Sequence, residues 1–122
     1  MSWDFDDDRP IYLQLMEQIQ LKIISGIYKF GEKLPSVRDM AQEASVNPNT
    51  MQKALTELER TGLVFSQRTI GRFITNDSNM IKTMRNDLAK KQIEKFLLSI
   101  KKIGYTRQET IFLVEDLIKE LK

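Results

Sequence analysis

The chain has no cysteine and no histidine among its 122 residues. Without cysteine there are no disulfides and no thiolate metal sites, which agrees with a cytoplasmic protein. Without histidine the chain lacks the commonest general base and the commonest transition-metal ligand, and a Ser-His-Asp or Cys-His catalytic arrangement is excluded. A phosphate-binding glycine loop is also missing. We therefore expect a protein that is not an enzyme and that uses no cofactor and no metal.

Long apolar runs are absent as well. No segment approaches the roughly 20 apolar residues that cross a bilayer, so no membrane partner is expected. The start, MSWDFDDDRP, lacks the positive and then apolar pattern of a secretory signal. Its four aspartates, Asp4, Asp6, Asp7 and Asp8, are interpreted as part of a loose, solvated chain end.

The charge balance permits a polyanionic partner without requiring one. The net charge is +2, and the four acids of the first eight residues conceal a mild basic excess in the rest of the chain. The composition, 41% hydrophobic and 30% charged, is that of an ordinary globular protein. The length indicates one domain, or one domain with a small appendage.

The first half of the chain has the pattern of a helix-turn-helix. After a helix over about residues 10–25, an extended piece ends at Leu34, because the residue before a proline avoids the helical region. Ser36 and Asp39 form the capping pattern that begins a second helix. Asn47 is a suitable N-cap for a third, with Pro48 at the first helical position. A few residues separate the last two helices, as in helix-turn-helix proteins.

Two β-prone segments follow the third helix, which is expected to end at Gly62. They cover residues 63–67 and 72–75 and flank a short turn that contains glycine, so they indicate a hairpin. A helix-turn-helix followed directly by a hairpin predicts a winged helix. The fold class is therefore mainly α with a small β wing, and residues 1–75 form an N-terminal winged helix-turn-helix domain.

The third helix has a polar stripe opposite its apolar face. The stripe carries amide, hydroxyl and basic groups and no carboxylate: Asn49, Gln52, Lys53, Thr56 and Arg60. On any single helix a solvated face is the better explanation of such a stripe, so the stripe alone does not decide the function.

The last part of the chain, residues 80–122, predicts a two-helix hairpin. A linker at 76–79 precedes a long helix over about 80–103, and Thr106 with Glu109 forms the capping box of a last helix. Such a hairpin is too small to bury a core of its own, and its apolar arc is too wide for one partner helix. We therefore expect a dimerisation hairpin and a homodimer; the alternative is that the tail packs on its own winged helix. The expected dimerisation residues are Ile93, Phe96, Leu97, Ile100, Ile111, Val114, Leu117, Ile118 and Leu121.

Three stretches resemble the GntR family of bacterial transcription regulators. They are DRPIYLQLMEQIQLKIISGIY, FGEKLPSVRDMAQEASVNPNTMQKALTELERTGLV and the wing QRTIGRFI, and together they cover about residues 8–75. The short two-helix tail resembles the YtrA-type subfamily, whose tail serves dimerisation and whose members tend to repress operons that encode ABC transporters. This resemblance implies a repressor of a transporter operon.

The resemblance also implies which residues contact double-stranded DNA. Carried over position by position, the expected contacts are Ser36, Arg38, Asn47, Asn49, Thr50, Gln52, Lys53, Gln67, Arg68 and Thr69. Alternatives stay open: Arg38 pairing with a carboxylate, Asn47 acting only as a helix cap, and Arg68 being merely solvated. In this fold the start of the third helix faces the major groove, where asparagine and glutamine pair with adenine.

The sequence departs from the family pattern at four positions. In the wing, Arg72 replaces a small hydroxyl residue and Thr69 replaces a glycine; because glycine lets the wing backbone enter the minor groove closely, Thr69 argues against that insertion. In the third helix, Pro48 and Gln52 stand where other members often have arginines. We interpret this as a preference for an operator half-site that is rich in A·T pairs.

The leading hypothesis is a sequence-specific regulator that binds an inverted-repeat operator as a homodimer and represses transcription, its own gene included. The alternative is a winged-helix module that binds proteins and no operator. The acid-free stripe favours DNA, because a protein-binding face would present exposed aromatic anchors. A small-molecule effector, which the sequence does not identify, would bind at the dimer interface or between the tail and the winged helix.

Overall fold

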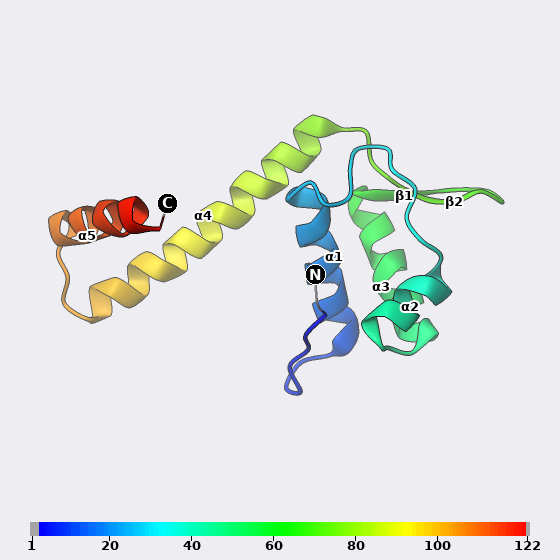
Figure 1. Ribbon diagram of the computed structural model, residues 1–122, viewed down its shortest axis with the longest axis horizontal. Helices are drawn as coiled ribbons and strands as arrows, with labels where there is room; N and C mark the ends of the chain where they lie inside the picture. Colours follow the sequence, from blue (N-terminus) through cyan, green and yellow to red (C-terminus); the bar gives the residue numbers. More distant parts are fainter. Residues whose placement is uncertain (1–2, 122) are drawn as a thin grey trace. The chain divides into compact units, whose positions relative to one another are not determined.

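The computed structural model describes residues 3–121. Within this range the chain forms five helices and one antiparallel two-stranded sheet (Figure 1). The elements are α1 (Ile11–Ile24), α2 (Val37–Ala44), α3 (Pro48–Thr61), β1 (Val64–Gln67), β2 (Gly71–Ile74), α4 (Ser78–Lys102) and α5 (Arg107–Glu120). Two compact units result, one ending at Arg85 and the other beginning at Asn86. The predicted fold class is confirmed.

Helix α3 is the centre of the first unit, and α1 and α2 both pack against it (Figure 1). The apolar positions that recur at helical spacing supply the core. The buried members on the three helices are Leu15, Ile19 and Ile23; Met40, Ala41 and Ala44; and Met51, Ala54, Leu55 and Leu58. Burial of these side chains removes apolar surface from water and so stabilises the three-helix arrangement.

The ends of the helices follow the local sequence signals. The Ser36 hydroxyl accepts a hydrogen bond from the Asp39 N–H at 3.1 Å and caps α2. Asn47 caps α3, with Pro48 as its first residue, and Gly62 ends it with φ at +87°. Between α2 and α3, Ser45 adopts a left-handed conformation with φ at +58°, which permits the tight turn of the helix-turn-helix.

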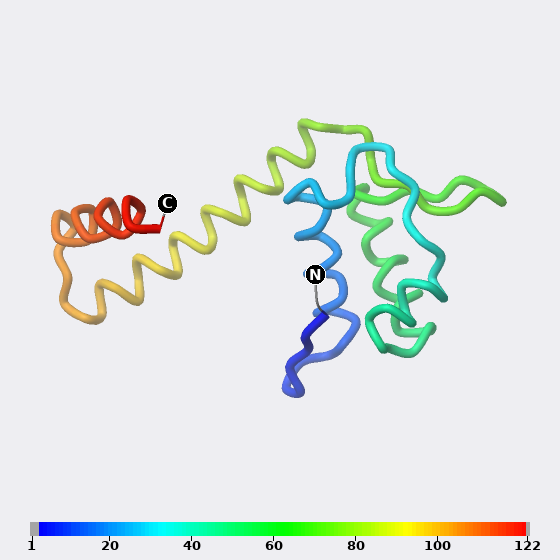
Figure 2. The backbone as a smooth tube through the Cα atoms, viewed as in Figure 1, coloured from blue at the N-terminus to red at the C-terminus, as the bar shows by residue number. Residues whose placement is uncertain are grey.

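The wing consists of β1, β2 and the turn between them, with Phe65 opposite Phe73 in the register. Lys33, in the segment between α1 and α2, adds a bridge to β2, and the Leu34 N–H donates to the Arg72 carbonyl at 2.9 Å. Figure 2 shows this segment running beside the hairpin. The extended conformation expected at Leu34 is confirmed, and the structure adds that it pairs with the wing.

The beginning of α4 belongs to the first unit. Asp77 caps this helix by accepting a hydrogen bond from the Met80 N–H at 3.0 Å, so the helix begins at Ser78. Ile81 is only 3% exposed and joins the core of the winged helix, and Met84 packs against it. The linker expected at residues 76–79 is therefore shorter than predicted, because Asp77 provides a helix cap.

The N-terminal segment, residues 3–9, is not the loose chain end that we expected. Its backbone is held by the buried side chain of Gln14, which accepts from the Asp6 N–H at 2.7 Å and donates to the carbonyls of Asp6 and Arg9, both at 2.9 Å. Trp3 covers the Lys22 ammonium, 3.4 Å from the ring centroid, and donates to Glu43 at 3.1 Å. The prediction was wrong because the side chains that hold the segment, those of Gln14, Lys22 and Glu43, belong to helices outside it.

The second unit contains the rest of α4 and all of α5. Thr106 and Glu109 form the expected reciprocal capping box at the start of α5. Thr110 is the residue that this unit buries most, and its hydroxyl donates to the Thr106 carbonyl at 2.9 Å. Nearly every apolar side chain of the unit is exposed or half-buried. Within residues 3–121, none of the helices combines the length and hydropathy needed to span a membrane.

Candidate nucleic-acid interface

The start of α3 presents polar side chains to solvent. Asn47, Asn49 and Gln52 are exposed, and Thr50 is half-buried. The Asn47 side-chain oxygen is occupied, because it accepts the Asn49 N–H at 2.8 Å. The side chain of Asn49 makes no hydrogen bond within the described chain, and Gln52 makes only a long contact, 3.5 Å, to the Thr56 hydroxyl. Both amides are therefore available to donate to and accept from a base edge.

Lys53 has a contact that sequence reasoning did not foresee. Its ammonium lies 3.8 Å from the ring centroid of Tyr12 on α1. Such a cation–π contact stabilises the packing of α1 on α3 and leaves the charge at the surface. Lys53 is exposed, so the predicted phosphate contact and the contact with Tyr12 are compatible only if the ammonium faces both partners.

Arg38 on α2 is an exposed cation that forms no ion pair with the carboxylates of residues 3–121. Pairing with a nearby carboxylate, the alternative considered for this residue, is thus not observed. Ser36, two residues before it, is exposed, and its hydroxyl caps α2. The first turn of α2 therefore presents one unpaired guanidinium and one hydroxyl.

The tip of the wing carries the other predicted contacts, Gln67, Arg68 and Thr69, all of which are exposed. The Ile70 N–H donates to the Gln67 carbonyl at 3.1 Å and closes the turn. Thr69 has φ at +66°, in the left-handed region that glycine adopts readily. For a β-branched residue such as threonine this conformation is energetically unfavourable. The structure thus places Thr69 in the conformation that the family's glycine adopts readily.

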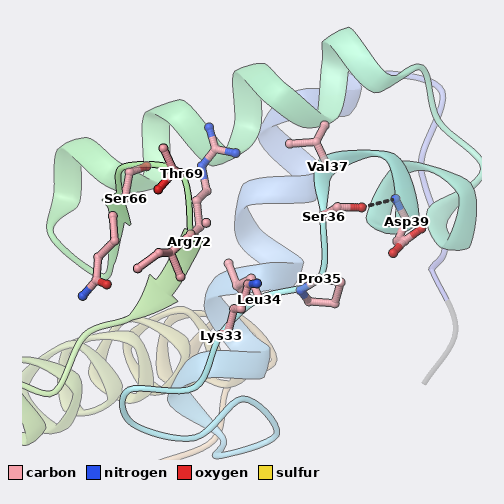
Figure 3. A pocket seen from close by; sticks show the side chains of 12 residues that line it. Lys33, Leu34, Pro35, Ser36, Val37, Asp39, Ser66, Thr69 and Arg72 are labelled. Carbon is pink, nitrogen blue, oxygen red and sulfur yellow. Dashed lines mark hydrogen bonds between the residues drawn. The ribbon is translucent and has the colours of Figure 1, made fainter.

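A hollow of about 830 Å³ lies between the wing and the start of α2 (Figure 3). We call it the wing hollow. It brings Ser36 of α2 together with Gln67 and Thr69 of the wing, three residues that the sequence placed in one interface. Lys33 and Asp39 also line it. Lys33 was not among the residues predicted for this interface. The only sequence signal for it was the extended conformation expected at Leu34, since an extended segment can pair with a strand of the wing.

Arg72 does not lie free on the outer face of its strand. It points toward α3 (Figure 3), and its Nε donates to Glu59 Oε1 at 2.6 Å. The Ser66 hydroxyl donates to the same oxygen at 2.6 Å. Burial raises the pKa of Glu59, but the hydrogen bonds from Ser66 and Arg72 and the charge of Arg72 outweigh burial, so the pKa is lowered overall. Glu59 is therefore ionised at neutral pH.

The residues predicted for dimerisation lie on the surface of the second unit. Ile100 and Val114 are half-buried, whereas Ile93, Phe96, Leu97, Ile111, Leu117, Ile118 and Leu121 are exposed. Ile118 is 55% exposed and Leu121 is 85% exposed. Phe112 and Leu113, which were not among the predicted residues, extend the same apolar surface.

The helix-turn-helix, the wing and the polar surface along both define a winged helix-turn-helix protein. Residues 11–74 match the family described as "Bacterial regulatory proteins, gntR family". The chain belongs to this family, as its motifs led us to expect.

Two relatives match almost the whole chain. The uncharacterized HTH-type transcriptional regulator YhcF of Bacillus subtilis (strain 168) is 36% identical over 111 residues, which cover 91% of this chain and 92% of that protein. The HTH-type transcriptional repressor YtrA of the same organism is 31% identical over 114 residues, 93% of this chain and 88% of that protein. These relatives confirm a transcriptional regulator, not an enzyme, and the resemblance to YtrA.

Solved structures agree with this assignment. A GntR family transcriptional regulator from Listeria monocytogenes superposes with a TM-score of 0.85 at 38% identity, over 92% of this chain and 98% of that one. The DNA-binding domain of AraR in complex with operator ORX1 superposes with a TM-score of 0.56 at 26% identity, over 62% of this chain and 99% of that domain.

Proposed function

We propose that the protein is a repressor that binds an inverted-repeat operator as a homodimer. The observation that carries the proposal is the exposed, acid-free beginning of α3, where the Asn49 amide is unbonded within the described chain and the Gln52 amide makes only a long 3.5 Å contact to Thr56. In a winged helix this end of the recognition helix enters the major groove. Free amides there read adenine, and arginines beside them contact phosphates or guanine.

The proposed DNA contacts divide into two groups. Asn49, Thr50 and Gln52 of α3 read base edges, and Asn47 combines this role with its helix cap. The second group positions the protein on the sugar-phosphate backbone: Ser36, Arg38, Lys53, Gln67, Arg68 and Thr69. Arg38 and Arg68 support the assignment because neither is neutralised by an ion pair within residues 3–121.

The dimer is supported by the apolar surface of α4 and α5. Side chains such as Leu117, which is 47% exposed, gain free energy when they are buried, at roughly 25 cal/mol per Å² of apolar area. Pairing of two tails about a twofold axis buries this surface and presents two winged helices to two half-sites. A homodimer therefore accounts for both the tail and the inverted repeat.

Repression and its targets rest on relatives. YtrA of Bacillus subtilis is named a repressor, and the family resemblance adds an operon for a transporter and the regulator's own gene as targets. A regulator that acts on bacterial DNA works in the cytoplasm, which is the location we propose.

The test is binding of the purified protein to a labelled duplex from the promoter upstream of its own gene, compared with a scrambled duplex, across a salt series. We expect an affinity roughly a thousandfold tighter for the promoter, which weakens steeply with salt because bound phosphates release counterions. The stoichiometry should be two protomers per site.

Two other outcomes of this binding experiment would change the conclusion. Weak and equal binding to both duplexes would mean either that the operator lies at other genes or that a ligand must first position the two winged helices. A protein that binds neither duplex even at low salt would contradict the proposal, and a protein-interaction module would become the better account of the winged helix.

A further inference from the structure

One carboxylate on α3 accepts hydrogen bonds from side chains of both strands of the wing. Glu59, in the last turns of α3, accepts hydrogen bonds from Ser66 of β1 and Arg72 of β2 on one oxygen. Ser66 and Arg72 are direct partners in the strand register. The Glu59–Ser66–Arg72 cluster therefore ties both strands of the wing to the recognition helix at the same point.

Within the described residues, Ser66 and Arg72 are the residues nearest the tip that form hydrogen bonds outside the hairpin. The base of the wing is fixed by backbone hydrogen bonds, from Leu34 to Arg72, from Ile74 to Glu32 and from Thr75 to Leu63. Beyond the Ser66–Arg72 pair, the hydrogen bonds of residues 67–70 stay within the hairpin. The direction of the tip relative to α3 is thus set at Ser66 and Arg72, where Glu59 holds both side chains and the Leu34 N–H holds the Arg72 carbonyl.

We propose that Glu59 and Arg72 are a positioning pair, which sets where the wing tip lies relative to the beginning of α3 when the protein binds DNA. The proposal rests on the DNA-binding function proposed above. Arg72 contributes through Glu59 and not by contacting DNA, because its side chain is only 18% exposed and its charge is paired. Arg68, at the tip, is the residue whose contact depends on this placement.

Preorganisation is the physical reason for such a pair. A contact that is misplaced by about 1 Å loses much of its value, and a mobile segment pays an ordering cost on binding. With the pair intact, the wing tip is placed before DNA arrives. Without it, only the backbone hydrogen bonds from the 31–34 segment hold β2, so the tip is placed less closely and part of the free energy of its DNA contact is lost to ordering the wing.

The test is a double-mutant cycle on a duplex that the wild-type protein selects from a random pool. Arg68→Ala is measured in the wild-type, the Glu59→Ala and the Glu57→Ala backgrounds. Glu57 is the matched control, because it lies on the same helix, carries the same charge and pairs only with exposed Arg60, at 3.7 Å. A second cycle replaces Arg68→Ala by Asn49→Ala, a proposed contact outside the wing.

The proposal predicts coupling between the pair and the wing tip only. Arg68→Ala should weaken binding about tenfold in the wild-type and Glu57→Ala backgrounds, and about twofold in the Glu59→Ala background, since residues in one network are non-additive. Asn49→Ala should cost the same factor in all three backgrounds. Glu59→Gln, which keeps an oxygen acceptor, should restore part of the effect of Arg68→Ala.

An equal loss from Arg68→Ala in all backgrounds would overturn the positioning role. Coupling of Glu59 to Asn49 as strong as to Arg68 would overturn it too, because it would indicate a general effect on folding. If Glu59→Ala does not fold, judged by circular dichroism, Ser66→Ala takes its place and removes one of the two hydrogen bonds. Failure of the wild-type protein to select any duplex would refute the proposed function itself.

Discussion

Thr69 is held in a conformation that its side chain disfavours. Its φ of +66° lies in the left-handed region, where a β-branched residue is a rare exception. The surrounding turn imposes this conformation, because the Ile70 N–H and the Gln67 carbonyl close the hairpin around it. The wing therefore stores strain at the tip that we expect to approach DNA.

Replacing Thr69 should release that strain. Thr69→Gly is expected to stabilise the protein by about 1 kcal/mol, since glycine adopts positive φ without a steric cost. Arg68→Gly, at the neighbouring position of ordinary φ, is the control and should destabilise by about 0.5–1 kcal/mol. Urea unfolding measures both; equal destabilisation by the two glycines would show that Thr69 is unstrained.

Gln14 is a second residue with an unusual role. Its buried side chain binds three backbone groups of the N-terminal segment, those of Asp6 and Arg9. Gln14→Leu removes three hydrogen bonds to the segment and should destabilise the protein by about 2 kcal/mol, because each such bond contributes roughly 0.5–1.5 kcal/mol. Gln18→Leu, which removes one exposed bond to Asp4, is the control and should cost less than about 1 kcal/mol. Thermal unfolding that shows equal losses would mean the segment is not fixed by Gln14.

At the scale of the element, α3 combines a structural and a proposed binding role at its first turn. Asn47 caps the helix, and the cap explains the residue without DNA. Because aspartate caps as well as asparagine does and also suits the positive end of the helix dipole, the two roles are separable by substitution.

Asn47→Asp should leave the melting temperature unchanged or raise it, yet weaken operator binding at least about tenfold, because its carboxylate repels phosphates. Asn47→Ala should cost about 1 kcal/mol of stability by losing the cap. Asn86→Asp makes the same change of charge on α4 and serves as the control in calorimetry and fluorescence anisotropy. An Asn47→Asp protein that binds like the wild type would place this residue outside the interface.

At the scale of the whole molecule, the second unit has little core of its own. Its apolar side chains are mostly exposed, and Thr110 is the most buried residue in it. A hairpin of this size buries too small a fraction of its surface to be stable alone. The apolar surface of α4 and α5 is therefore the part of the protein that most requires a partner.

The double variant Ile111→Asp/Leu117→Asp should convert the dimer to a monomer in sedimentation, because buried unpaired carboxylates are costly. Operator affinity should fall by at least about a hundredfold, since the second half-site is no longer held by the same particle. Leu13→Asp changes an exposed apolar residue of α1 and should leave both unchanged. A wild-type protein that is already monomeric at micromolar concentration would rule out the proposed dimer.

The sequence alone was sufficient for the elements and for most of their ends, the start of α4 being an exception. Helix periodicity, the caps at Ser36, Asn47 and Thr106, and the stop at Gly62 are local signals, so the residues that specify them lie within a few positions of one another. The family could also be recognised from the sequence, because its motifs are continuous stretches of chain. These predictions were confirmed for the same reason: short-range chemistry needs no knowledge of the fold.

Tertiary packing decided the features that join distant residues. Trp3 bonds to Glu43, Gln14 holds the N-terminal segment, and Arg72 pairs with Glu59, 13 positions away in sequence. No local pattern predicts such partners, since an exposed arginine and a paired arginine look alike in a sequence. Only folding brings these charges and amides within hydrogen-bonding distance, and burial then favours the pairs that satisfy one another.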